Sequence, residues 1–166
     1  MTAGLEPYWL GPEDGQAVWV LGGLYTWKAL GAQTGGEYSL CEVQGPPGFA
    51  APLHLHDGED EAFYVASGEV TLFLGDEEVH LQQGGFGFAP SPIPHTFRLD
   101  TADARLLLLL TPGAAGHEAM FAEMGEPATA HVLPAPPKGP PDFAGLAAVA
   151  AKHGTKIVGP PPAATP

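Results

Sequence analysis

Apolar and polar residues alternate in short runs through the first two-thirds of the chain. A period of two is typical of β-strands with one buried face. Glycine pairs such as Gly22-Gly23 and Gly35-Gly36 separate the runs and favour tight turns. The continuous apolar run at 105–111 predicts a strand that is buried on both faces. We predict strands at 17–20, 24–29, 37–43, 53–56, 61–66, 70–74, 79–81, 86–89, 95–99 and 105–111.

The pattern changes in the last third of the chain, where helical segments and proline-rich connections replace the alternation. Residues 117–124 predict a short helix, and Asp142 is suited to cap a second helix that extends to Lys152. Short strands at regular spacing, followed by helices, indicate an all-β barrel or jelly roll with short C-terminal helices. We expect a barrel with an N-terminal arm over residues 1–112, a helical extension packed on the same domain over 113–158, and a flexible tail over 159–166.

Composition narrows the class of protein. The 166 residues, 45% of them hydrophobic, suit one folded domain with a single core. Six Lys and Arg residues against 19 Asp and Glu residues give a formal charge of -13. A surface of this charge repels phosphate backbones and anionic lipids, so we expect neither a nucleic-acid partner nor a membrane partner. Cys41 is the only cysteine, which excludes an intrachain disulfide and a zinc site with several cysteines.

We see no targeting or membrane segment in this sequence. The first residues have no basic region followed by an apolar run, as a signal peptide would have. The longest apolar run, at 106–110, is far shorter than the roughly 20 residues that span a bilayer. We therefore expect a soluble, cytoplasmic protein.

Candidate chemistry gathers in one segment, where His54 and His56 lie two residues apart and Glu61 follows. In a strand these two imidazoles point the same way, and a carboxylate on the next strand could join them in a metal site. A pair of surface histidines beside an acidic loop would give the same local pattern. The flanking glycines and a later histidine, His95, favour the metal site.

The spacing of these residues resembles the two motifs of the cupin superfamily. The first motif reads Gly, five residues, His-x-His, three or four residues, Glu, six residues, Gly. The second reads Gly, five residues, Pro-x-Gly, two residues, His, three residues, Asn. Pro92 and Leu99 depart from the second motif, at its glycine and its asparagine. The matching positions are Gly48, His54, His56, Glu61 and Gly68 in the first motif and Gly84, Pro90 and His95 in the second.

More narrowly, the chain resembles the single-domain quercetin 2,3-dioxygenase-like cupins, in the segments 8–12, 59–65 and 146–161. The resemblance implies a double-stranded β-helix, that is, a jelly-roll barrel. It also implies that Glu61 acts as the catalytic base for a flavonol. The metal ligands that it implies are His54, His56, Glu61 and His95.

Three imidazoles and one carboxylate suit one divalent transition metal: Fe, Mn, Ni, Co or Cu, with positions open for substrate or O2. Zinc stays among the candidates, because ligand type alone does not select one of these metals. Phe63 and Val65 share a strand face with Glu61, and Phe97 and Leu99 share a face with His95, so we expect these four to line the substrate pocket. A dianionic substrate would need an inward Arg or Lys, which we do not find securely. The pattern therefore favours a small apolar or aromatic molecule.

Two functions from different classes fit these residues. The first is a metal-dependent dioxygenase, an oxidoreductase that cleaves an enolisable, flavonol-like aromatic ring with O2. The second is a non-enzymatic metal-containing cupin that binds a small apolar ligand as a sensor or carrier. A cupin isomerase or a different dioxygenase is a third reading. The early aromatic strands offer a sheet edge, so we expect a homodimer. We expect surface or helix-capping positions for the other histidines, which are His80, His117, His131 and His153.

Overall fold

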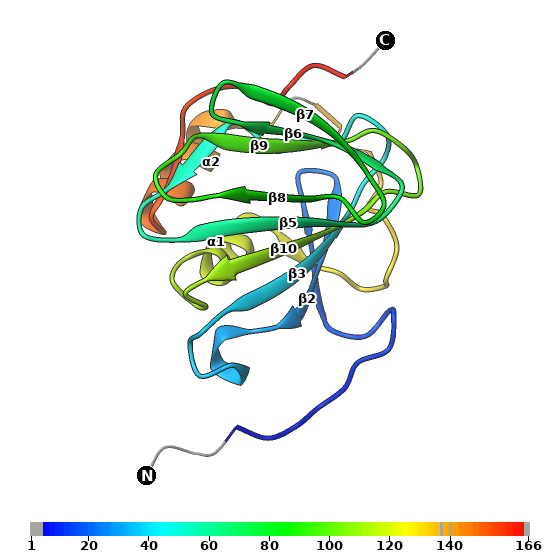
Figure 1. Cartoon of the computed structure of the whole chain (residues 1–166), viewed down its shortest axis with the longest axis vertical. Helices are drawn as coiled ribbons and strands as arrows, with labels where there is room; N and C mark the ends of the chain where they lie inside the picture. The colour runs from blue at the N-terminus through cyan, green and yellow to red at the C-terminus, as the bar shows by residue number, and fades with distance from the viewer. Residues whose placement is uncertain (1–4, 137, 140, 165–166) are drawn as a thin grey trace.

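Two antiparallel β-sheets face each other in the computed structural model, which describes residues 5–136, 138–139 and 141–164 (Figure 1). The strands are β1 (Gln16–Val20), β2 (Gly23–Ala29), β3 (Ser39–Gln44), β4 (His54–His56), β5 (Asp60–Ser67), β6 (Glu69–Leu74), β7 (Glu77–Gln82), β8 (Phe86–Ala89), β9 (His95–Leu99), β10 (Arg105–Thr111), β11 (Glu126–Pro127) and β12 (Thr155–Ile157). A 7-stranded sheet has the order β11-β1-β2-β3-β10-β5-β8, and a 5-stranded sheet has the order β12-β4-β9-β6-β7. The predicted all-β jelly roll is confirmed.

Each strand predicted from the alternation is present, and the bounds at 86–89, 95–99 and 105–111 coincide with those in the structure. The alternation did not reveal β11, β12 or the 3-10 helix Gly31–Gln33. These elements have only two or three residues, which is too short for a period to be recognised. β12 forms because residues 155–157 pair with β4, about a hundred positions earlier in the chain.

β10 differs from the expectation that both of its faces are buried. Leu106, Leu108 and Leu110 are buried in the core, whereas Leu109 on the opposite face is 37% exposed. The strand lies between β3 and β5, so its backbone is paired on both edges. The second sheet covers only its inner face, and the outer face meets solvent.

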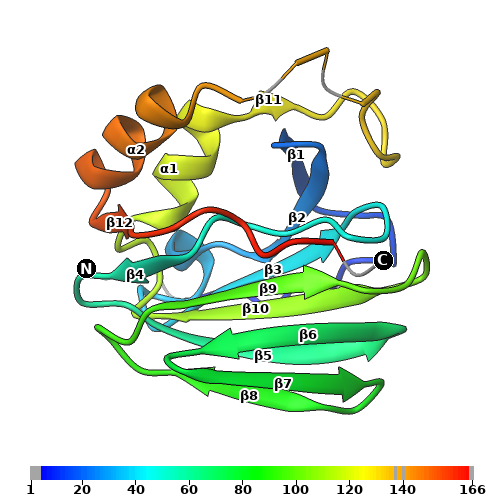
Figure 2. The same ribbon diagram turned by 90° about the horizontal axis from the view of Figure 1, so that it is seen from above.

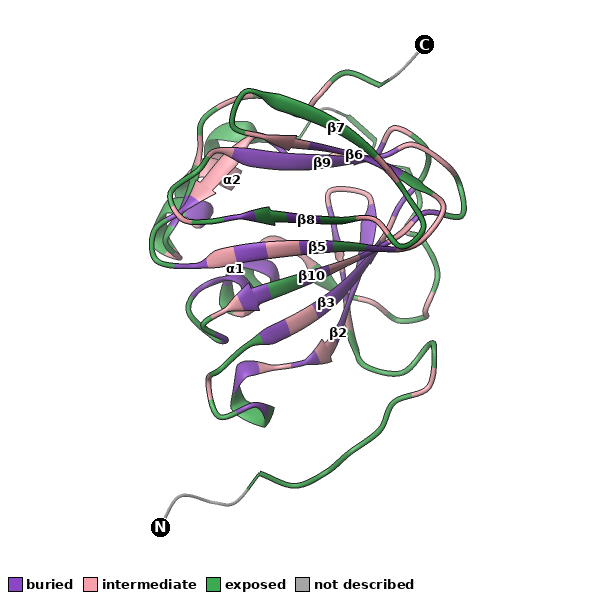
Figure 3. Cartoon of the chain, in the orientation of Figure 1, coloured by how far each residue is buried: buried purple, intermediate pink, exposed green. Residues whose placement is uncertain are grey.

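The core lies between the two sheets, and Figure 3 marks buried residues on strands of both of them, such as β3 and β9. It includes Phe63 from the larger sheet and Leu72 and Phe97 from the smaller one, each 2% exposed or less. The strong alternation of burial in β5 follows the predicted pattern, with Glu61, Phe63 and Val65 inward and Tyr64 outward. The inward face of β5 therefore brings a carboxylate into an apolar interior.

Two helices close one end of the barrel, at the end marked by β1 and β12 and opposite β7 and β8 (Figure 2). They are α1 (His117–Met124) and α2 (Phe143–Lys152), as predicted. The Asp142 side chain caps α2 by accepting a hydrogen bond from the backbone N–H of Gly145. In the part of the chain that the structure describes, no helix combines the length and the apolar character needed to cross a bilayer.

The C-terminal segment returns to the barrel beyond the helices. Leu53 pairs through its backbone with Val158, Gly159 and Pro160, and the Arg98 guanidinium donates to the carbonyl of Ala163. The expected flexible tail thus lies along the barrel over residues 159–164, and residues 165–166 lie outside the described residues, as do residues 1–4 of the expected N-terminal arm. The domain division, the homodimer and the cytoplasmic location stay predictions.

The two turn glycines Gly68 and Gly84 allow a test of the barrel's turns. Both have positive φ, at 70° and 87°. A Cβ on Gly68 would lie 2.5 Å from Thr101 Oγ1 and 2.6 Å from Ala104 Cα, whereas a Cβ on Gly84 would meet nothing within 4 Å.

We predict that Gly84→Ala lowers the free energy of unfolding by about 1 kcal/mol, the cost of the left-handed backbone alone. Gly68→Ala is expected to lower it by about 3 kcal/mol, because the packed turn must also move. Urea denaturation of both variants measures the difference. Equal losses would show that the contacts around Gly68 do not constrain the turn.

Candidate metal centre

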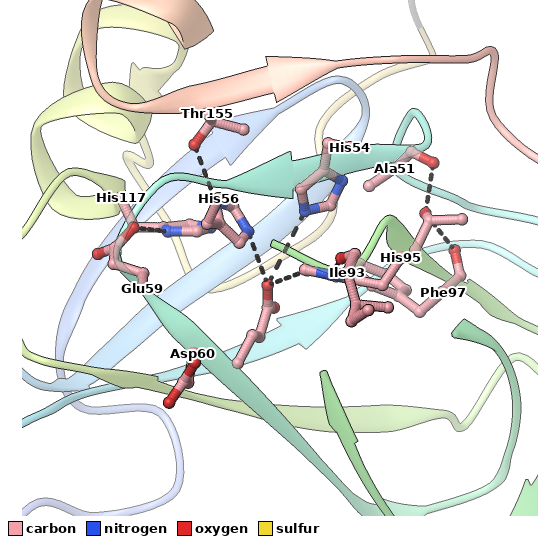
Figure 4. A network of polar contacts seen from close by, with 12 residues as sticks. Ala51, His54, His56, Glu59, Asp60, Ile93, His95, Phe97, His117 and Thr155 are labelled. Atoms are coloured by element: carbon pink, nitrogen blue, oxygen red, sulfur yellow. Dashed lines mark hydrogen bonds and ion pairs between the residues drawn. The ribbon is translucent and has the colours of Figure 1, made fainter. Parts of the chain in front are cut away.

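Four side chains from both sheets converge between them (Figure 4). His54 and His56 come from β4 and His95 from β9, and His54 and His95 are direct partners across these paired strands. Glu61 reaches them from β5 in the opposite sheet. Its Oε2 lies 3.1 Å from His56 Nε2, 3.0 Å from His95 Nε2 and 3.8 Å from His54 Nε2. The structure therefore brings together all four ligands that the resemblance implies.

Hydrogen bonds to the backbone orient two of these imidazoles. His54 Nδ1 lies 2.7 Å from the carbonyl oxygen of Pro52, and His95 Nδ1 lies 2.7 Å from that of Ile93. A carbonyl only accepts, so in both rings Nδ1 donates and Nε2 of the neutral ring keeps its lone pair. Both lone pairs face the Glu61 carboxylate. This arrangement, in which the far nitrogen is held by a carbonyl, is the one that metal-binding histidines generally adopt.

The third imidazole is oriented by a residue that the sequence did not single out. Thr155 on β12 is the register partner of His56, and its Oγ1 lies 3.0 Å from His56 Nδ1. Thr155 is buried, so its hydroxyl is a fixed partner. No local pattern could have revealed this contact, because the two residues are 99 positions apart.

Burial and the shared carboxylate shift the pKa values of this cluster in different directions. Burial raises the pKa of the Glu61 carboxyl, but its contacts with the three imidazoles outweigh burial and hold the pKa well below its usual range. Burial lowers the pKa of His56 to about 4, although its contact with Glu61 opposes this shift. Burial also lowers the pKa of His95, but its contacts with Glu61 outweigh burial and raise the pKa. The cluster thus favours an ionised carboxylate beside a neutral His56.

The donor set fits a divalent transition metal. A buried carboxylate oxygen that faces imidazole lone pairs needs a proton or a cation between them, because acceptors repel one another. The four candidate ligand atoms lie within 4.8 Å of one another. Nitrogen and carboxylate oxygen ligands suit Fe, Mn, Ni, Co, Cu and Zn.

An apolar pocket of about 60 Å³ opens beside the cluster, toward the two helices. His54 and Glu61 reach its wall, and Phe97, Met120 and Phe121 provide apolar surface. Among the described residues, its lining contains no Lys or Arg. Lys28 lies outside this lining and donates to the carbonyls of Pro12 and Asp14.

The predicted pocket residues divide into two groups. Phe97 is part of the lining, whereas Phe63, Val65 and Leu99 lie deeper, in the core between the sheets. A residue that shares a strand face with a candidate metal ligand does not necessarily line the pocket, because side chains fill most of the interior of a small barrel. The pocket forms only at the end covered by the helices, and their side chains supply much of its wall.

The expectation of a surface or capping position was wrong for His117. It is 3% exposed, its Nδ1 lies 2.9 Å from Glu59 Oε2, and its ring centroid lies 4.3 Å from that of His56. Glu59 is also buried, at 4%. The cause is tertiary, since α1 folds back over the turn before β5. His153 does occupy the C-cap of α2, as expected.

Known proteins resemble this chain over much of its length. The family model for the cupin domain matches residues 42–111. A quercetin 2,3-dioxygenase of Bacillus subtilis (strain 168) is 30% identical over 137 residues, which cover 81% of this chain and 40% of the relative. A second quercetin 2,3-dioxygenase, of Aspergillus japonicus, is 29% identical over 113 residues, or 64% of this chain and 32% of the relative. The chain thus spans less than half the length of either enzyme.

The fold has relatives among solved structures. An RmlC-like cupin from Shewanella frigidimarina superposes with a TM-score of 0.57, covering 66% of this chain and 94% of that one. Its sequence identity is 16%, so this likeness concerns the fold alone.

We predict that His95→Gln lowers the affinity of the protein for divalent transition metals by about 100-fold or more, because even the loss of a ligand's supporting partner costs 10- to 100-fold. The matched control is His80→Gln, since the His80 side chain is 70% exposed and lies outside the cluster. Elemental analysis after dialysis against each metal measures the difference. Equal metal content in the two variants would contradict the assignment of His95 as a ligand.

We predict a smaller loss, of about tenfold, for Thr155→Val, which removes the partner of His56 Nδ1 and leaves all four candidate ligands in place. Thr26→Val is the control, because Thr26 is also buried and its Oγ1 also lies 3.0 Å from a histidine nitrogen, that of His131. Calorimetric metal titration compares the two. A loss of the same size in both variants would mean that the effect comes from barrel packing.

Proposed function

The chain belongs to the cupin superfamily, and on that premise we propose that it is a metal-dependent dioxygenase that cleaves an enolisable aromatic ring, such as that of a flavonol, with O2. The observation that carries the proposal is the cluster of three imidazoles and a carboxylate at the wall of an apolar pocket. The similarity to two quercetin 2,3-dioxygenases supports the same chemistry. Because one fold hosts many reactions, the proposal depends on the site and not on the barrel.

We propose that His54, His56, His95 and Glu61 hold one divalent metal: Fe, Mn, Ni, Co, Cu or Zn. When bound, a redox-active metal would supply electron transfer to O2 and positions at which the substrate and O2 lie close together. The protein's contribution is to fix these ligands. Two backbone carbonyls and the Thr155 hydroxyl hold the far nitrogen of each imidazole, so the near nitrogens keep a common direction.

Glu61 is the proposed base for the substrate hydroxyl. Its low pKa keeps the carboxyl ionised near neutral pH, which is the form that accepts a proton. A carboxylate of low pKa is a weak base, so it matches a substrate whose hydroxyl is itself acidic. An enol attached to an aromatic system meets this requirement better than an aliphatic alcohol does.

The pocket selects for apolar, uncharged ring systems. Among the residues that the structure describes, its lining has no Lys or Arg to pair with an anionic substrate, and burying an unpaired charge there would cost several kcal/mol. Its volume of about 60 Å³ is well below the roughly 300–1,000 Å³ of sites that hold drug-sized molecules. A flavonol can therefore enter only if wall residues of the helices move. Met120 and Met124 suit this movement, since methionine side chains repack easily.

The test is oxygen uptake by purified protein loaded in turn with Fe, Mn, Ni, Co and Cu, with a flavonol as substrate. We expect uptake with at least one metal, and we expect Glu61→Gln to lower kcat/KM by about 100-fold or more because it removes the base. Metal content is measured in parallel, so that loss of the metal is separated from loss of the base. Absence of turnover with all five metals would refute the flavonol dioxygenase. A flavonol that binds without oxygen uptake would instead support a sensor or carrier.

A further inference from the structure

A buried histidine–carboxylate pair, His117 and Glu59, lies beside the same pocket. His117 is the first residue of α1 and lines the pocket, and Glu59 precedes β5. Figure 4 shows the pair beside His56. His117 and Glu59 are 3% and 4% exposed, so both polar groups belong to the interior.

The contact between them determines which nitrogen of His117 faces the pocket. A carboxylate only accepts, so His117 Nδ1 donates to Glu59 Oε2 over 2.9 Å. In the neutral ring, Nε2 is then an acceptor, and it makes no hydrogen bond to any residue that the structure describes. No fully buried side-chain nitrogen or oxygen lacks a partner in this part of the chain, so Nε2 reaches accessible space. The accessible space that His117 borders is the pocket.

The imidazole is held firmly in place. The next residue, Glu118, accepts hydrogen bonds from the backbone N–H of Gly31 and from the Ser39 hydroxyl, which anchor the start of α1 to the barrel. On the other side, a Cβ on Gly116 would clash with the carbonyl oxygen of His153, so α1 begins in direct contact with the end of α2. The Phe121 ring packs edge-on against His117. An acceptor held this way is preorganised for a ligand.

A second metal site is the other chemistry that these atoms could serve, since His56, Glu59 and His117 also bring ligand atoms within 4.8 Å of one another. However, both nitrogens of His56 already have partners, namely Glu61 at Nε2 and Thr155 at Nδ1. Only two ligands would then be left for a second ion. The geometry therefore favours a hydrogen-bonding role.

We propose that His117, oriented by Glu59, accepts a hydrogen bond from a second hydroxyl of the substrate and so selects polyhydroxylated aromatic rings over rings that carry only the enolic hydroxyl. This inference rests on the proposed function, because it assumes that the enolic oxygen lies at Glu61. His56 lies close to both residues, with its centroid 4.3 Å from that of His117 and its Nε2 3.1 Å from Glu61 Oε2. Glu61 and His117 both line the pocket, so a planar fused ring with its enolic oxygen at Glu61 would present its other edge to His117.

The experiment measures the binding of two flavonols to the metal-loaded protein by calorimetry without O2. One flavonol has the enolic hydroxyl only, and the other has two further hydroxyls on the fused ring. We expect the wild type to bind the polyhydroxylated flavonol about tenfold more tightly, as one additional buried hydrogen bond would give. His117→Asn keeps a donor at the Nδ1 position for Glu59 but has no acceptor at the position of Nε2. The preference for the polyhydroxylated flavonol should therefore disappear, while the flavonol with only the enolic hydroxyl should bind as tightly as it does to the wild type.

Two further variants make the test specific. His117→Gln places an amide oxygen near the position of Nε2 and should recover most of the preference. His153→Asn is the matched control, because His153 Nε2 contacts Glu123 Oε2 at 2.8 Å outside the pocket, and its preference should equal that of the wild type. Melting temperatures of all variants show whether each is folded.

Several results would overturn the inference. The first is equal affinity of the wild type for the two flavonols. The second is an unchanged preference in His117→Asn. The third is a loss of affinity in His117→Asn that is the same for both flavonols. If His117→Asn does not fold, the wild-type preference and the glutamine variant decide the question. If the wild type binds two equivalents of metal per chain and a His117 variant binds only one, His117 is a metal ligand. This result would also overturn the inference. If the protein turns over flavonols but shows no preference for the polyhydroxylated one, only this inference is overturned. If it neither binds flavonols nor takes up oxygen with them, the proposed function is overturned as well.

Discussion

The contact between Glu61 and three histidines joins the two halves of this barrel. Glu61 projects from the 7-stranded sheet, and His54, His56 and His95 project from the 5-stranded sheet, all into the interior. A buried carboxylate is costly unless partners compensate its charge, and here the three imidazoles that contact it all lie on the opposite sheet. The distance and register between the sheets are therefore coupled to the chemistry of the site. A cation bound by the same atoms would stabilise the same arrangement of strands.

The C-terminal third of the chain contributes residues to the site that the barrel strands start to form. β12 supplies Thr155 to His56, α1 places His117 beside the same ring, and side chains of both helices cover the pocket. The helical extension is thus part of the site and not an accessory to it. Proteins of low sequence identity share the barrel fold, but residues outside the barrel can give each of them a differently lined pocket.

The pocket has a polar side and an apolar side. Glu61, His54 and His117 supply polar groups to its wall, while the remaining wall is mainly carbon. This division suits an aromatic molecule that has polar groups at its edges, because each hydroxyl would find an acceptor and the ring faces would contact side chains such as Phe97 and Met120. Closure by the helices would also exclude water from the site, which strengthens hydrogen bonds formed there.

Local periodicity was sufficient for the parts of the protein that depend on neighbours in the chain. The alternation along 61–66 assigned Glu61 to the inner face, and the His-x-His spacing put His54 and His56 on one side, because a strand has a strict period of two. The motif glycines and His95 then completed the ligand set by resemblance. Burial on one face of β10 was not visible, since an apolar run does not say whether a second layer covers it.

The sequence by itself determined the strands β1 to β10, the helices α1 and α2 and the four residues of the cluster. The tertiary structure alone decided that Thr155 supports His56 and that His117 and Glu59 form a buried pair. These contacts join residues 99 and 58 positions apart. It also decided that Phe97 borders the pocket while Phe63, Val65 and Leu99 fill the core. The physical reason is that periodicity tells which way a side chain points from its own strand, whereas what it meets there depends on where the rest of the chain packs.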